Sequence, residues 1–298
     1  MFYVVAIASI ILLTGYSGQI SLGHGALVAI GSYTAALTQI YLHQPIWMCF
    51  VASVLVTALF GAFLGFAAAR LSGPYLAGTT LALAVGLPSI ANQFRILGGE
   101  QGINFDVGWP PKSLGADFTQ YKWFFWISAL ATLIAMWWLH NILRSRYGRA
   151  WRAVHKNEVA AELAGIHVGR AKVLAFTLSA GLAGLAGALL AMTMNNVSPS
   201  VFPLYLSLSL LTGAVLSGVT TLGGVMIGAV TLVAIPEIAT SVSSRWGDSG
   251  NLATYLPNLV VSVLLLLTVF LAPRGPIEKF RAHRSTPERI SQTKSKAQ

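Results

Sequence analysis

The chain has 298 residues, of which 55% are hydrophobic and only 9% are charged. An ordinary soluble domain has roughly a quarter of its residues charged, so this chain cannot cover a globular surface with polar groups. The net charge of +10 would suit a nucleic-acid-binding protein, but the basic tail lacks interleaved aromatic residues and matches no nucleic-acid-binding motif. Composition therefore indicates an integral membrane protein of the all-α class.

Charge-poor apolar runs recur from end to end, and about 20 such residues cross a bilayer as a helix. We expect one polytopic transmembrane helical bundle of about nine spans over residues 1–272. The first run lacks the charged leader and cleavage pattern of a signal peptide, so we expect it to be retained. The expected spans are Phe2 to Thr14, Ile20 to Leu42, Ile46 to Ala69, Tyr75 to Leu97, Trp123 to Leu143, Val173 to Asn195, Leu204 to Val219, Gly223 to Val242, and Leu252 to Ala272.

Two glycine-rich runs, GYSGQISLGHG and TTLGGVMIG, interrupt this pattern. Non-helical backbone is tolerated at membrane depth only where it is buried in protein or lines a cavity, and we expect broken or re-entrant helices there. Both runs contain the pattern SGxx[S/T]LG, starting at Ser17 and at Ser217. This echo would fit the two related halves of many transporters, and chance similarity of glycine-rich sequence is the alternative.

Polar groups inside spans are costly and therefore indicate either function or specific packing. We predict that the substrate path is lined by Gln19, Ser21, His24, Thr79, Thr80, Asn92 and Glu237. For His24 the alternative is a buried packing role, which is the more common use of a histidine in a helix. Glu237 follows Pro236, which removes a helix hydrogen bond, so its alternative roles are capping of backbone groups or pairing with Arg95.

Most of the basic residues lie in the loop of residues 144–172 and in the tail of residues 273–298. Cytoplasmic loops are enriched in Lys and Arg, which predicts that both segments are cytoplasmic and that the mixed-charge loop from Gly98 to Lys122 is external. Counting back places the N-terminus outside, and a further helix before the first span would explain how it arrives there. We expect the tail to be disordered.

The basic loop contains a short segment with defined ends. Asn157 can cap a helix from Glu158 to Ala164, which begins with an acid at its positive end and stops at Gly165. The three alanines Ala160, Ala161 and Ala164 give this helix a small-residue face. We predict a docking element for another protein rather than a plain solvated loop.

No motif for catalysis or nucleotide binding is present. The sequence has no Walker A motif, no HExxH, no metal-spaced Cys and His cluster and no GxSxG elbow, and its single cysteine cannot form an intrachain disulfide. We therefore expect no catalytic residue, metal site or cofactor site, and energy supplied by a partner. Glu237 is the one acidic residue in an expected span, whereas a proton relay would need several such acids. This argues against a secondary transporter, which is the alternative function.

Several ordered segments resemble the permease subunits of ATP-binding-cassette importers for branched-chain amino acids, the LivM-like branch. They are GYSGQISLGHGALVAIGSYTAAL, RLSGPYLAGTTLALA, LGGEQGI, RSRYGRAWRAVHKNEVAAELAGIHVGRAKVLAFTLSAGLAGLAGAL and LLLLTVFLAPRG. In LGGEQGI, Leu97 stands where the family usually has threonine. Members usually have one more helix before the span that precedes GYSGQ.

The resemblance implies a division of labour among subunits. Glu158 to Gly165 would be the coupling helix that docks on an ATPase subunit, with Arg149, Glu158, Ala160, Ala161 and Gly165 in that contact. It also implies a second, paralogous permease, two ATPase subunits that bind ATP and Mg²⁺, and an extracytoplasmic solute-binding protein, at a bacterial inner membrane. Branched-chain amino acids, urea and short amides are all substrates within the family.

Overall fold

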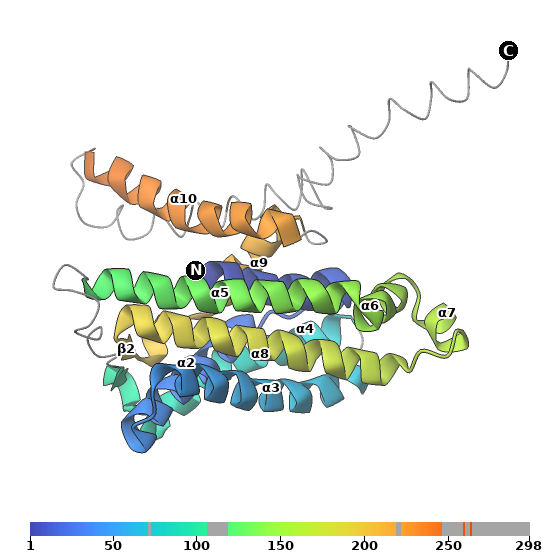
Figure 1. Ribbon diagram of the computed structural model, residues 1–298, viewed down its shortest axis with the longest axis horizontal. Coiled ribbons are helices and arrows are strands. Elements are labelled where there is room, and N and C mark those ends of the chain that lie inside the picture. Colours follow the sequence, from blue (N-terminus) through green and yellow to red (C-terminus); the bar gives the residue numbers. More distant parts are fainter. Residues whose placement is uncertain (71–72, 106–118, 219–221, 246–258, 260–262, 264–298) are drawn as a thin grey trace, which may run out of the picture. The chain divides into compact units, whose positions relative to one another are not determined.

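The computed structural model describes residues 1–70, 73–105, 119–218, 222–245, 259 and 263 of the protein (Figure 1). They fall into two compact units, residues 1–210 and 211–298, and each is described by itself. Among the described residues, six helices are long and apolar enough to cross a membrane, and two further apolar helices, Phe2–Tyr16 and Leu222–Ile238, are shorter. The expected polytopic helical bundle is confirmed, and the number of spans stays a prediction, because most of Leu252 to Ala272 lies outside the described residues.

The first unit contains most of the helices. They are α1 (Phe2–Ile10), the π-helical turn η1 (Ile11–Tyr16), α2 (His24–Leu42), α3 (Ile46–Arg70), α4 (Pro74–Gln93), α5 (Gln120–Arg144), α6 (Arg146–Lys156), α7 (Glu158–Leu163), α8 (Val168–Met194) and the first part of α9 (Leu204–Leu216). Short 3-10 turns lie at η2 (Arg95–Leu97), η3 (Gly99–Gln101) and η5 (Pro199–Val201). The second unit holds the rest of α9, the turn η6 (Leu222–Gly224) and α10 (Val225–Arg245).

The centre of the first unit is formed by α2, α3 and α8. Small residues let transmembrane helices approach closely, and a Cβ atom built on Gly61 or Gly187 would collide with α8 or α2. The N-terminal helix α1 is also enclosed, with every side chain from Val4 to Ile10 buried. By contrast, α3 and α5 expose large apolar side chains such as Leu59 and Trp137, as expected of lipid-facing helices.

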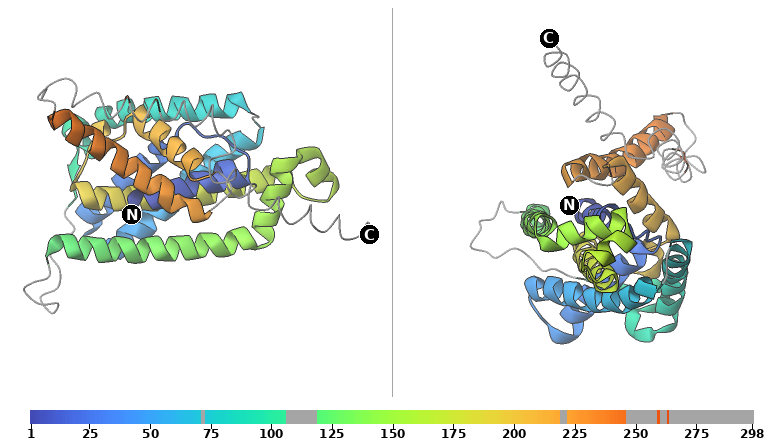
Figure 2. Two further views of the ribbon diagram at one scale, coloured as in Figure 1. Left: turned by 90° about the horizontal axis from the view of Figure 1, so that it is seen from above. Right: turned by 90° about the vertical axis from the view of Figure 1, so that its right-hand side faces the viewer.

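The two ends of α8 carry different structures. Its N-terminal end follows α7, and Figure 1 and the left view of Figure 2 both show α6 and α7 beyond the ends of the long helices. Its C-terminal end leads into β2 (Asn196–Val197), which pairs antiparallel with β1 (Ile103–Asn104). Helix α7 and the β1–β2 pair therefore lie at opposite ends of α8.

Several boundaries differ from expectation, and α8 begins at Val168 rather than Val173. The second span begins at His24 rather than Ile20, because the backbone from Ser17 to Gly23 is not helical. The fourth ends at Gln93 rather than Leu97, because Phe94 is extended and a 3-10 turn follows. The basic loop contains α6, a complete helix that was not anticipated before Asn157.

Candidate functional site

The first glycine-rich run is a break between two helices, as predicted. We define the broken segment as residues 15–23, the last two residues of η1 and the non-helical stretch that precedes His24. Gly18 has φ +74°, a left-handed conformation that glycine adopts without steric cost. The amide of Gln19 still reaches back to the carbonyl of Leu13 at 3.1 Å, so the chain reverses tightly and remains packed inside the protein.

Polar groups of the broken segment find hydrogen-bond partners within the segment and on α4 and α8. The side-chain nitrogen of Gln19, Nε2, donates to the Ser17 hydroxyl (2.6 Å) and to the backbone carbonyl of Lys172 on α8 (3.2 Å). The backbone amide of Leu22 donates to the hydroxyl of Thr80 on α4 at 3.0 Å. Backbone groups outside a helix at membrane depth must find partners within the protein, and Thr80 provides one for Leu22.

His24, predicted for the substrate path, lies in the packed interior. Its Nε2 atom is 2.9 Å from the Ser9 hydroxyl and 3.4 Å from the Ser179 hydroxyl, which donates to the Ser9 carbonyl at 2.7 Å. The side chain is fully buried, so no solute reaches the ring in this structure. The geometry supports the packing role, in which His24 joins α1, α2 and α8.

Two other predicted residues, like His24 through its Nδ1 atom, have a buried polar atom without a hydrogen-bond partner among the described residues. Gln19 Oε1 and Ser21 Oγ are buried and have no hydrogen-bond partner among the described residues. A buried polar atom without a partner costs free energy, so such atoms mark places where water or a polar solute is accommodated. Within the broken segment, these two side chains are the best placed to contact a solute.

The remaining predicted path residues do not gather at one point. Thr80 is buried beside the broken segment, whereas Thr79 and Asn92 are exposed on α4. Glu237 is exposed on α10, in the second unit. The structure thus brings Gln19, Ser21, His24 and Thr80 together, and the roles of all seven as path-lining residues stay predictions.

The short helix after Asn157 forms as predicted, ending one residue earlier than expected. The Asn157 side-chain oxygen accepts a hydrogen bond from the amide of Ala160 at 3.0 Å, the usual N-cap arrangement. At the other end Gly165 has φ +82°, and its amide and that of Ile166 bond to the carbonyls of Glu162 and Ala161. Both ends of α7 are therefore defined by the residues that the sequence singled out.

The exposed face of α7 differs from expectation. Ala161 is only 3% exposed and packs within its own chain, so it is unavailable to a partner; only Ala160 and Ala164 of the expected alanine face are exposed. Instead, α7 presents Val159 and Leu163, which are 67% and 86% exposed. This pair was missed, although its i, i+4 spacing places both side chains on one helix face.

Glu158 and Arg149, both predicted for the ATPase contact, also bond within the chain. The ammonium group of Lys172 lies 2.7 Å and 2.8 Å from the two carboxylate oxygens of Glu158. Lys172 is buried, while Glu158 is about half exposed. Arg149 is exposed and donates to the carbonyl of Arg144 at 3.2 Å. A partner could reach Arg149 directly but would meet a Glu158 that is already paired.

Helix α6 places a further group against the broken segment. Trp151 anchors the helix, being buried and donating from its indole nitrogen to the carbonyl of Ala171 at 2.9 Å. His155, two turns from the helix start, has its Nδ1 atom 3.0 Å from the carbonyl of Gly15. Sequence reasoning missed this contact, since nothing in the loop's charge pattern indicates it.

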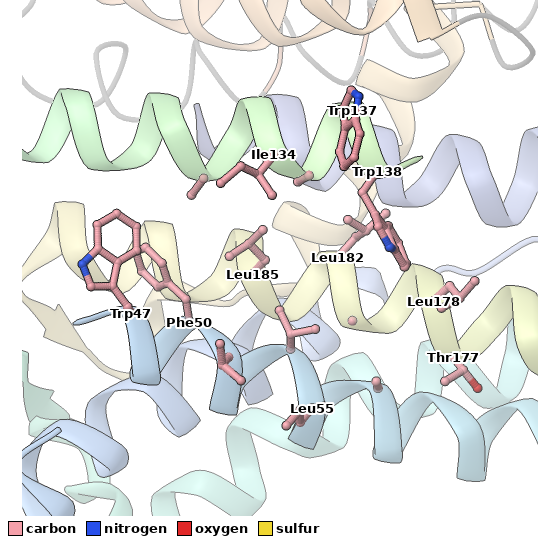
Figure 3. Close-up of a pocket in the computed structure, with 16 residues that line it drawn as sticks. Trp47, Phe50, Leu55, Ile134, Trp137, Trp138, Thr177, Leu178, Leu182 and Leu185 are labelled. Carbon is pink, nitrogen blue, oxygen red and sulfur yellow. The ribbon is translucent and has the colours of Figure 1, made fainter. Parts of the chain in front are cut away.

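An apolar groove of 560 Å³ lies between α3, α5 and α8. Figure 3 shows Trp47 and Phe50 of α3 facing Ile134 and Trp138 of α5 across Leu185 of α8. None of the predicted path residues lines it. Its one hydroxyl group among the described residues, on Thr177, donates to the carbonyl of Val173 at 2.8 Å. Burying a charged solute among such groups would be costly, so this groove is not a route for one.

Together, the apolar helices, the buried break and the capped helix define the class, a multi-span helical membrane protein. The chain belongs to the family described as the permease component of branched-chain amino acid transport systems, whose model matches residues 1–271. This confirms the family that the sequence segments indicated.

Individual relatives agree with the family. The chain is 32% identical over 260 residues to the high-affinity branched-chain amino acid permease LivM of Salmonella typhimurium, covering 80% of this chain and 61% of the relative. It is 28% identical over 279 residues to LivH of Escherichia coli K12 (88% and 86%), and 28% identical over 260 residues to the L-arabinose permease AraH of that strain (85% and 74%). The chain therefore spans less than two thirds of the length of this LivM relative. No solved structure matches it.

Proposed function

We propose that the chain is the transmembrane subunit of an ATP-binding-cassette importer for branched-chain amino acids or related small polar solutes. The observation that carries the proposal is the family match over residues 1–271. Both LivM and LivH relatives are named for branched-chain amino acids, whereas AraH is named for L-arabinose. We favour branched-chain amino acids over sugars as the solute, because the chain is 32% identical to LivM and 28% identical to AraH.

The energy for transport comes from partner ATPase subunits, which bind ATP and Mg²⁺. Support comes from α7, a capped helix between two long helices that presents the exposed apolar pair Val159 and Leu163. Apolar side chains exposed together at the surface mark contact sites for other proteins. The rest of the importer comprises a second ATPase, a paralogous permease and an extracytoplasmic solute-binding protein. Escherichia coli K12 has both a LivM and a LivH relative, which supports pairing with a second permease.

The protein resides in the bacterial inner membrane with its tail and the α6–α7 region in the cytoplasm. Two observations support this orientation: the positive charge of that region, and its position at the opposite end of α8 from the β1–β2 pair. Inside the membrane, we place solute contact at Gln19 and Ser21, whose buried polar atoms Oε1 and Oγ have no described partner.

The test of the function is reconstitution of the chain with its ATPases, the second permease and the binding protein into proteoliposomes. ATP supplied on the ATPase side should drive accumulation of radiolabelled leucine, and an uncoupler should leave it unchanged. Accumulation that needs no ATP and collapses with an uncoupler would instead establish a secondary transporter, the alternative function.

The test of the path is a pair of substitutions in the same assay. Gln19→Ala and Ser21→Ala should raise KM for leucine, since each removes a group with free hydrogen-bonding capacity. Thr177→Val, in the apolar groove, is the matched control and should leave KM unchanged. Equal effects from all three variants would contradict the placement of the path.

A further inference from the structure

The broken segment is held directly by the region that carries α7. The first contact comes from α6, where Nδ1 of His155 lies 3.0 Å from the carbonyl of Gly15. The same ring fits against Gly18: a Cβ atom at that position would lie 2.8 Å from Cδ2 of His155. His155 therefore touches the segment both by a hydrogen bond and by close packing.

The second contact runs through Lys172 at the start of α8. Its ammonium group pairs with Glu158, the first residue of α7, and its backbone carbonyl accepts a hydrogen bond from the side chain of Gln19. Lys172 thus contacts α7 through its side chain and the broken segment through its backbone carbonyl. Because Lys172 is buried, the pair with Glu158 is also the charge compensation that its position requires.

A third contact adds to these two. The guanidinium group of Arg152 on α6 lies 5.8 Å from the ring centroid of Tyr16, within the range of a cation–π interaction. The broken segment is therefore contacted from α6 at Gly15, Tyr16 and Gly18, and from α8 at Gln19. A displacement of α6 and α7 cannot leave these contacts unchanged.

We propose that His155 and Lys172 are positioning residues that transmit movement of α7 to the broken segment and so couple ATPase closure to the opening of the path. This inference rests on the proposed importer function and adds to it a specific route through the chain. Force on the exposed Val159 and Leu163 moves α7. The Glu158–Lys172 pair and the His155–Gly15 contact pass that displacement to Gln19 and Gly18. The segment they move contains the two polar side chains assigned to solute contact.

The experiment measures leucine transported per ATP hydrolysed by the complete importer in proteoliposomes. Glu158→Gln, Lys172→Met and His155→Ala each remove one contact, and each should lower this ratio at least about fivefold, the lower range of typical coupling between sites. Co-purification of the ATPases should remain as in the wild type for Lys172→Met and His155→Ala, whose positions lie outside α7. Glu162→Gln is the matched control, since it neutralises an exposed acid on the same helix that no described ion pair uses.

A charge swap separates transmission from simple structural support. In the double variant Glu158→Lys with Lys172→Glu, the ion pair is rebuilt in reverse, and the ratio should return to within about twofold of the wild type, because the two changes are not additive when the residues interact. Should this variant fail to insert, Lys172→Met and His155→Ala still decide the question, since Lys172→Met removes the buried charge itself and His155→Ala leaves the Glu158–Lys172 pair intact.

A spectroscopic measurement reports on the broken segment itself. Ile20 is exposed and accepts a nitroxide label through Ile20→Cys in a Cys49→Ala background. In the wild type, trapping the ATPases with vanadate should change the label's spectrum, and in Glu158→Gln and His155→Ala this change should be lost.

The two proposals fail in different ways. If the wild-type complex takes up leucine without ATP, the importer function is wrong. If the wild type couples uptake to ATP but Glu158→Gln and His155→Ala match Glu162→Gln in both ratio and spectrum, only the transmission route is overturned.

Discussion

The hydroxyl of Ser53 on α3 donates a hydrogen bond of 2.9 Å to the carbonyl of Gly31 on α2. Gly184 of α8 fits against both partners: a Cβ atom there would lie 2.6 Å from the Ser53 carbonyl oxygen, and one on Gly31 would collide with the Gly184 backbone. Three helices thus meet backbone to backbone at one level. Because lipid is as apolar as the helix surfaces, the hydrophobic effect does not hold transmembrane helices together, and close packing and hydrogen bonds of this kind do so instead.

Gly184→Leu should therefore disrupt the first unit. Overpacking a tight core costs about 1–3 kcal/mol, and here the obstructing atoms belong to another helix's backbone, which cannot rotate away. We expect a lower thermal transition and a smaller monodisperse fraction in detergent. Gly78→Leu on α4 is the control, because nothing lies within 4 Å of its added Cβ atom. Equal stability of the two variants would contradict the packing described for α2, α3 and α8.

The position of His24 leads to a second prediction. His24→Ala removes the group that faces the Ser9 and Ser179 hydroxyls and should lower the free energy of unfolding by about 1–3 kcal/mol. If the residue only packs, KM for leucine should not change. His140→Ala, at an exposed position on α5, controls for loss of a histidine. A raised KM with unchanged stability would instead restore His24 to the substrate path.

Part of this structure was predictable because membrane constraints act locally. Apolar length indicated α3 and α8, and Asn157 with Gly165 indicated both ends of α7, since cap geometry depends on neighbouring residues alone. The break before His24 was indicated by its glycines, but its exact start was not, because Ser21 and Leu22 are as compatible with a helix as with a turn.

The errors arose where distant segments decide the outcome. Ala161 has the small size of an interface residue, and only the fold of α7 against its own chain shows that it is buried. Helix α6 was hidden by its basic residues, although Gly148, Trp151 and Val154 recur at helical spacing and are its buried face. No sequence pattern links His155 to Gly15 or Lys172 to Gln19, because these contacts depend on tertiary packing.

The caps of α7 give a third prediction. Asn157→Ala removes the acceptor for the amide of Ala160 and should destabilise the helix by about 1 kcal/mol. Gly165→Ala places a Cβ atom at φ +82° and should cost about 1–2 kcal/mol. Hydrogen exchange of the amides in residues 158–163 should become faster in both variants. Asn141→Ala, at an exposed position on α5, should leave this exchange as in the wild type; unchanged exchange in all three would show that the caps do not hold α7.

The exposed apolar pair on α7 gives the last prediction. Leu163→Asp and Val159→Asp should each weaken co-purification of the ATPase subunits at least about tenfold, which corresponds to 1.4 kcal/mol, because a charge would be desolvated in an apolar contact. Insertion and thermal stability of the isolated chain should persist, since both side chains already face solvent. Ala161→Asp tests a different property, because it buries a charge within the chain. It should unfold α7 itself, which would appear as faster amide hydrogen exchange in residues 158–163. If Leu163→Asp retained the ATPases as fully as Glu162→Gln, the docking surface would have to lie elsewhere, and the exposed Arg149 on α6 would become the first position to test.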